Sequence, residues 1–89
     1  MKVENLRSSS GREVPNQFQI TDDNGNRFFQ SYKSIIAKIS NKGEISLDSN
    51  YWDYSVTTGK YRNIFLRETK KETEKKISSG IYKLENLNK

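Results

Sequence analysis

The chain contains no cysteine and no histidine. Without cysteine, neither a disulfide nor a thiolate metal site can stabilise the fold. Without histidine, the commonest metal ligand and the usual acid–base group near pH 7 are both missing. Only a carboxylate site for Mg²⁺ or Ca²⁺ remains open, and Asp22-Asp23-Asn24-Gly25 lacks the closing glutamate of a calcium loop. We therefore predict no metal, no cofactor and no enzymatic activity.

Apolar residues are also scarce. Hydrophobic residues make up 31% of the 89 residues and charged residues 30%, so each large apolar side chain matters to a single small core. The longest aliphatic run, Ile35-Ile36-Ala37, is far too short for a membrane span or a signal peptide. The composition predicts a single-domain, soluble, cytoplasmic protein without membrane partners.

Positive charge is present in excess and is concentrated. The net charge is +5, and residues 60–76 hold seven Lys or Arg against three Glu, which gives 7 − 3 = +4. Such a field attracts nucleic acid or an acidic protein face. A lysine-rich helix that is merely solvated explains the same numbers. The basic residues are Lys60, Arg62, Arg67, Lys70, Lys71, Lys75 and Lys76.

Aromatic residues cluster just before this basic segment. Residues 51–67 hold the only Trp and five of the ten aromatic residues. Tyr51 and Tyr54 are candidates for stacking on unpaired bases. The alternative is that Trp52, Tyr61 and Phe65 simply form the core of a domain that is short of aliphatic residues.

The first half of the chain predicts a flexible tail followed by hairpins. Residues 1–15 show no period and contain Ser8-Ser9-Ser10-Gly11, so we expect a mobile N-terminal tail and a single α+β domain over residues 16–89. Residues 16–21 alternate as a half-buried strand with Phe18 and Ile20 on one face. Residues 22–26 predict a type I′ hairpin turn at Asn24-Gly25, with residues 27–32 as the return strand.

Residues 32–40 fit two templates. Tyr32, Ile35, Ile36 and Ile39 have helical spacing, whereas the Ile35–Ile39 stretch also alternates as a strand. We favour the strand because a tight hairpin at 41–43 then leads directly into the alternating residues 44–48.

Two short helices follow. A helix over about 58–67, capped by Ser55, Thr57 or Thr58, places Tyr61, Ile64 and Phe65 toward a sheet. Thr69-Lys70-Lys71-Glu72 is a capping-box pattern that predicts a second helix over about 70–79, ended by a left-handed Gly80. The predicted fold is a small antiparallel β-sheet of three to five short strands, packed by these two helices.

A resemblance accompanies this pattern. The run Phe29-x-Ser31-Tyr32, Trp52-x-Tyr54-Ser55-x-Thr57-Thr58-x-x-Tyr61 and Phe65-Leu66 resembles a family of small uncharacterised proteins carried by bacteriophages and related mobile elements. The resemblance covers roughly residues 27–87 and leaves the first quarter unmatched. It implies an accessory viral protein in a host cytoplasm and no catalytic residues.

The predicted function is binding. Hydroxyls and free amides at a helix start form an anion site, with basic side chains alongside. We expect nucleic acid as the ligand. The alternatives are a host protein with an acidic or nucleic-acid-binding surface, inhibited by this protein, and self-association through an edge strand. The predicted binding residues are Thr57, Thr58, Lys60, Arg62, Asn63, Arg67, Lys70 and Lys71.

Overall fold

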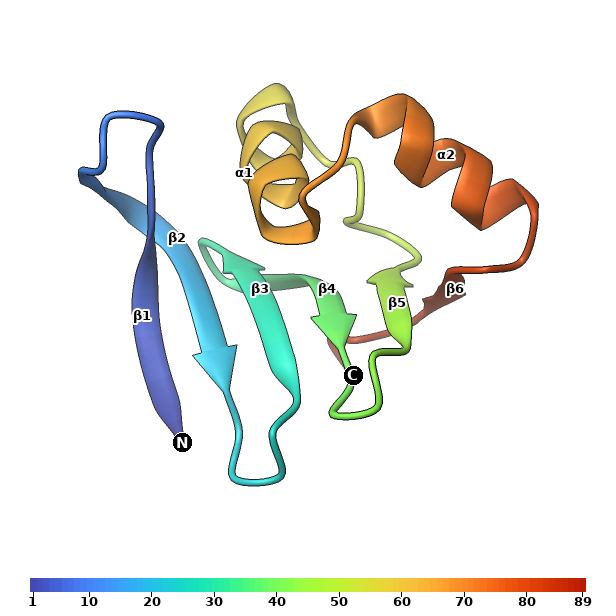
Figure 1. Ribbon diagram of the computed structural model, residues 1–89, viewed down its shortest axis with the longest axis horizontal. Helices are drawn as coiled ribbons and strands as arrows, with labels where there is room; N and C mark the ends of the chain where they lie inside the picture. Colours follow the sequence, from blue (N-terminus) through green and yellow to red (C-terminus); the bar gives the residue numbers. More distant parts are fainter.

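The computed structural model describes residues 1–89 and shows one sheet with two helices (Figure 1). The α+β class is confirmed, but the sheet has six strands, in the order β1-β2-β3-β4-β5-β6. It is mixed, because β6 runs parallel to β5 after the helical crossover while every other pair is antiparallel. The strands are β1 (Lys2–Arg7), β2 (Glu13–Thr21), β3 (Arg27–Ser31), β4 (Ser34–Ile39), β5 (Ile45–Asp48) and β6 (Lys83–Glu85), and the helices are α1 (Val56–Leu66) and α2 (Lys70–Ser78).

Three hairpins share one loop design. The loops lie at 8–12, 22–26 and 40–44, and in each the N–H of the first residue donates to the carbonyl of the fifth. The fourth residue is a glycine with φ between +83° and +86°, whose N–H donates to the first carbonyl. The hairpins predicted at 22–26 and 41–43 are confirmed. The type I′ turn is wrong, because only Gly25, and not Asn24, has positive φ.

The first hairpin corrects the prediction of a mobile tail over residues 1–15. Strand β1 pairs with β2 from Lys2 opposite Thr21 to Arg7 opposite Glu13, and Leu6 is buried in the core. The tail prediction was wrong because a bulge between Asn5 and Arg7 interrupts the alternation of the strand.

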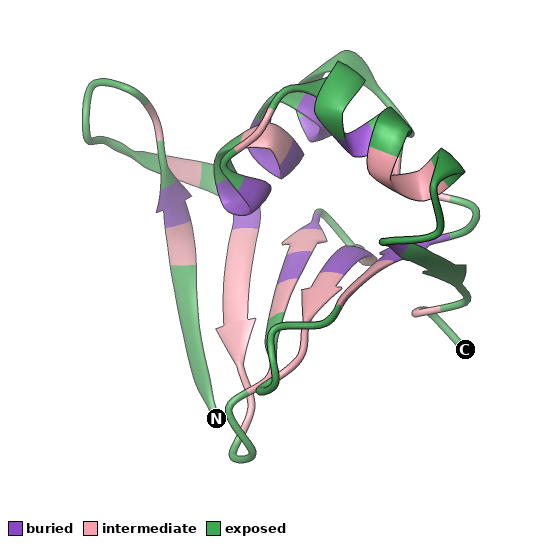
Figure 2. Cartoon of the chain, turned by 45° about the vertical axis from the view of Figure 1, so that its right-hand side comes forward, coloured by how far each residue is buried: buried purple, intermediate pink, exposed green.

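The helices cover one face of the sheet and leave the other open (Figure 2). Phe29 is fully buried on the helix side, with its ring centroid 5.9 Å from that of Phe65 in α1. Since side chains alternate along a strand, Phe28 points to the open face, together with Phe18 and Ile20 of β2. All three are half-buried, whereas Gln17 of β2 is buried under the helices. The strand was predicted correctly, but its hydrophobic face is the open one.

Helix α1 uses an inner face that differs from the predicted one. Its buried residues follow the spacing i, i+3, i+4, i+7, i+8, whereas Ile64 is 40% exposed. The prediction that Ile64 faces the sheet is therefore wrong, because Arg62 and Leu66 occupy that face. The buried residues are Thr58, Gly59, Tyr61, Arg62, Phe65 and Leu66.

Helix α2 begins as predicted. The Thr69 hydroxyl accepts the N–H of Glu72, and the Glu72 carboxylate accepts the N–H of Thr69, which confirms the capping box. Gly80 is left-handed with φ +82°, one residue after the C-cap Ser79. The helix docks through Thr73, which is fully buried, and through Ile77, which packs against the core.

Candidate functional site

The aromatic loop over residues 49–55, between β5 and α1, is anchored by a buried aspartate. Asp48, fully buried at the end of β5, accepts N–H groups from Asn50 and Tyr51 at 3.0 and 2.9 Å. Its other carboxylate oxygen accepts the N–H of Leu87 at 2.8 Å. One carboxylate therefore fixes the start of the loop and the C-terminal segment together.

Arg62 holds the other end of the same loop. Its side chain is 1% exposed, and its Nη1 donates to the Trp52 carbonyl at 2.7 Å and contacts an Asp53 oxygen at 3.4 Å. The guanidinium also lies 5.2 Å from the centre of the Trp52 ring, within the range of a cation–π contact. Arg62 thus connects α1 to this loop, and its burial contradicts the prediction that it binds a ligand directly.

Thr58 is also unavailable to a ligand. It is 2% exposed, and its hydroxyl is hydrogen-bonded to the hydroxyls of Ser31 and Ser55 at 3.1 Å each. The Ser55 hydroxyl accepts the N–H of Thr58 and is the N-cap, one of the three caps that the sequence allowed. Thr57 is exposed in the first turn.

The N-terminus of α1 favours anions. The N–H groups of the first two helical residues, Val56 and Thr57, have no partner within a helix. The first turn contains no acidic residue that would occupy the positive end of the helix dipole. A negatively charged group can therefore bind at this end without competition from a neighbouring carboxylate of the helix.

Beside this end lies a cationic hollow, which we define by Asp53, Lys60, Arg62, Asn63 and Lys70. Three cationic side chains meet one carboxylate there, so the excess is two positive charges. Lys70 pairs with Asp53 at 2.9 Å, while Lys60 is exposed and makes no ion pair. Burial favours a higher pKa of Asp53, but hydrogen bonds and charges from Lys70 and Arg62 outweigh it and lower the pKa.

The other predicted basic residues lie elsewhere. Arg67 is the exposed, left-handed C-cap of α1. Lys71 lines a second hollow with Glu72, Glu74 and Lys75, where the charges balance. The predicted surface is therefore brought together only in part: Lys60, Asn63 and Lys70 share one hollow, with Thr57 exposed in the first turn of the same helix.

Tyrosines line a groove that reaches the first turn of α1 at Thr58. The rings of Tyr51 and Tyr54 meet edge to face, with centroids 5.6 Å apart, and Tyr54 is 69% exposed. Both line a groove with Tyr32, which is 59% exposed on the turn between β3 and β4. Sequence reasoning missed Tyr32 because it was placed at the end of the return strand over 27–32, whereas it lies in the turn after β3.

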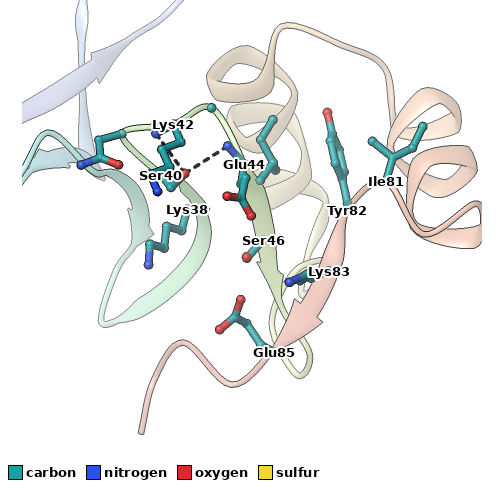
Figure 3. A pocket seen from close by; sticks show the side chains of 12 residues that line it. Lys38, Ser40, Lys42, Glu44, Ser46, Ile81, Tyr82, Lys83 and Glu85 are labelled. Atoms are coloured by element: carbon teal, nitrogen blue, oxygen red, sulfur yellow. Dashed lines mark hydrogen bonds between the residues drawn. The ribbon is translucent and has the colours of Figure 1, made fainter.

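A third hollow lies between the β4–β5 loop and β6 (Figure 3). Lys38, Lys42 and Lys83 line it with Glu44 and Glu85, so its charges largely cancel. It offers a weaker field to a polyanion than the cationic hollow does.

Comparisons with known proteins extend this description only to the family. No helix combines the length and the apolar character that crossing a membrane requires. No curated protein and no solved structure matches the chain significantly. The resemblance to bacteriophage proteins remains a prediction. A family of unknown function, DUF8033, matches residues 1–80, including the β1–β2 hairpin, and the chain belongs to this family.

Proposed function

We propose that this protein binds nucleic acid at the N-terminus of α1. The observation that carries the proposal is the cationic hollow beside a helix start without acidic residues. Phosphate groups are attracted to such a helix start by its free N–H groups and by its dipole. Lys60 and Lys70 then provide charges that neutralise neighbouring phosphates of the same backbone.

Nucleic acid is favoured over other polyanions by the exposed tyrosines next to the hollow. The groove and the hollow are lined by consecutive residues, Tyr54 and Asp53, so one ligand can reach both. A ligand with both phosphates and planar bases matches this combination of charge and aromatic surface.

The proposal is tested by fluorescence anisotropy with a labelled oligonucleotide at several salt concentrations. Affinity should fall steeply between about 50 and 200 mM salt, because binding releases counterions. Lys60→Gln should weaken binding and reduce the slope of log K against log salt by about one. Lys42→Gln is the matched control, since Lys42 lies in the β4–β5 loop, at the end of the molecule away from α1 (Figure 1). No binding at low salt would contradict the proposal.

A host protein target is the second candidate. Val56 and Ile64 line the same hollow and are 92% and 40% exposed, which suits a partly apolar interface. This candidate predicts that a nuclease-treated host lysate yields one stoichiometric partner, and that Val56→Ser abolishes its capture. Capture that disappears with nuclease would instead support nucleic acid.

A further inference from the structure

We infer that the groove of Tyr32, Tyr51 and Tyr54 holds an unpaired nucleobase, so that the ligand of this protein is single-stranded. The inference rests on the proposed function and names its ligand class. In a duplex the faces of the bases are stacked on one another, whereas in a single strand they are free to stack on aromatic side chains.

The rings of the groove are both accessible and positioned in advance. Tyr54 and Tyr32 expose more than half of their surface, at 69% and 59%. Tyr51 is half-buried, packs against the hydrophobic core and supports Tyr54 edge to face. The backbone N–H of Tyr51 is fixed on Asp48. Little conformational entropy is therefore lost when a base binds against these rings.

The backbone of Tyr32 is held in a costly conformation. Its φ is +55°, a region that residues other than Gly, Asn and Asp rarely adopt. Its N–H donates to the carbonyl of Asn16 at 2.7 Å, and Asn16 itself has φ +64°. The ring gains little burial in return, because it is mostly exposed. Gly or Asn would suit this turn better for stability alone, so a tyrosine here indicates a role in contact with a ligand.

The groove also matches a nucleotide in its polar groups. Asn16 and Ser34 line it and provide donors and acceptors for a base edge. Lys33 lines the same groove and adds a positive charge for the phosphate of the bound nucleotide. The next phosphates along the strand reach the cationic hollow past Asp53 and Tyr54.

The test compares single strands with a duplex of the same sequence by anisotropy at low salt. Tyr54→Ala should weaken single-strand binding about tenfold, the usual effect of removing one stacking ring. Tyr54→Phe keeps the ring and should bind like the wild type. The effect of Tyr54→Ala on duplex binding should be less than twofold.

Tyr32→Asn provides the readout that a purely structural tyrosine would not give. Asparagine tolerates the left-handed conformation, so this variant should unfold at a higher temperature while its affinity for single strands falls. A variant that binds single strands as tightly as the wild type would overturn the inference.

The outcomes separate this inference from the proposed function. If no nucleic acid binds, both fail. If single strand and duplex bind equally, and Lys60→Gln weakens both while Tyr54→Ala weakens neither, only the groove inference fails. Binding of a proline-rich peptide that oligonucleotides do not displace would also overturn it, because such peptides dock in aromatic grooves too.

Discussion

At the scale of residues, Arg62 shows how far burial can change the role of a charged side chain. Its guanidinium contacts the Trp52 carbonyl, the Asp53 carboxylate and the Asn63 amide oxygen, with Nε left without a partner. Those contacts connect α1 to the loop that carries Tyr51 and Tyr54. Arg62 therefore positions the groove and the hollow relative to each other.

Arg62→Leu should lower the free energy of unfolding by about 2 kcal/mol, because the charged hydrogen bonds to the loop are lost. The expected loss of stability is smaller than for a fully buried ion pair, because the Asp53 side chain is 37% exposed. Urea unfolding followed by the fluorescence of the single Trp measures the change. Lys60→Leu is the surface control and should shift stability by less than about 0.5 kcal/mol. Equal stabilities for the two variants would contradict the role assigned to Arg62.

A second residue-scale prediction concerns Glu68. Its carboxylate accepts hydrogen bonds from Lys76, Thr73 and Tyr82 at 2.7, 2.6 and 2.7 Å. Burial favours a higher pKa of Glu68, but these hydrogen bonds together outweigh it and lower the pKa. The hydrogen bonds of Lys76 to Glu68 and to Tyr82 raise the pKa of Lys76, while burial and the hydrogen bond to Glu68 raise the pKa of Tyr82.

Because the pKa of Glu68 is lower in the folded state, its contribution is complete above the ordinary value of 4.5 and is lost as the pH falls below it. Glu68→Gln should therefore cost about 2 kcal/mol at pH 7 and much less in acid. Thermal unfolding of both proteins across this pH range measures the difference. A difference that stays constant with pH would show that the carboxylate charge has no part in it.

At the scale of elements, two of the three glycine loops were predicted from the sequence and one was not. The loops at 22–26 and 40–44 were found because alternating residues flank them. The loop at 8–12 has the same pattern but was missed, because the bulged β1 shows no clear alternation. The start of α2 was predicted from its capping box, since capping depends on neighbouring residues, whereas the start of α1 was predicted at about 58 with three caps left open and lies at Val56. The inner face of α1 was not predicted, because burial of Arg62 depends on partners ten residues away.

Gly43→Ala should lower the free energy of unfolding by about 1 kcal/mol. Its φ is +85° and an added methyl group meets no atom within 4 Å, so only the left-handed backbone opposes alanine. Gly43→Asn should cost less, because asparagine adopts this conformation more readily. Urea unfolding distinguishes them, and an alanine variant as stable as the wild type would contradict this assignment of the loop.

Removal of residues 1–8 tests the correction of the N-terminal segment. Deleting β1 leaves β2 as an edge strand and removes Leu6 from the core, so the thermal midpoint should fall by more than about 5 °C. Hydrogen exchange of β2 amides should speed up at the same time. A truncated protein with unchanged stability would support the mobile tail instead.

At the scale of the whole molecule, the sequence shows how much charge the second half carries but not where it points. The excess of four over residues 60–76 is divided: Arg62 is buried, Lys76 pairs with Glu68, and Lys71 and Lys75 face glutamates. Beside the start of α1, Lys60 makes no ion pair, while Lys70 and Arg62 share the carboxylate of Asp53.

Asp53→Asn should therefore tighten nucleic-acid binding about threefold at low salt, since it removes the one carboxylate of the hollow and frees Lys70. Anisotropy titration of the variant measures this change, and Glu44→Gln in the hollow of Figure 3 is the matched control. A weaker or unchanged affinity would show that the hollow does not face the ligand.

The most direct test is the mapping of amide chemical shifts in ¹⁵N-labelled protein during titration with a single-stranded oligonucleotide. We expect the largest shifts at the start of α1, in the tyrosine groove and in the cationic hollow, at Tyr32, Tyr54, Thr57, Lys60 and Lys70. Shifts confined to the open sheet face around Phe18 and Phe28, or the absence of any shift, would contradict it.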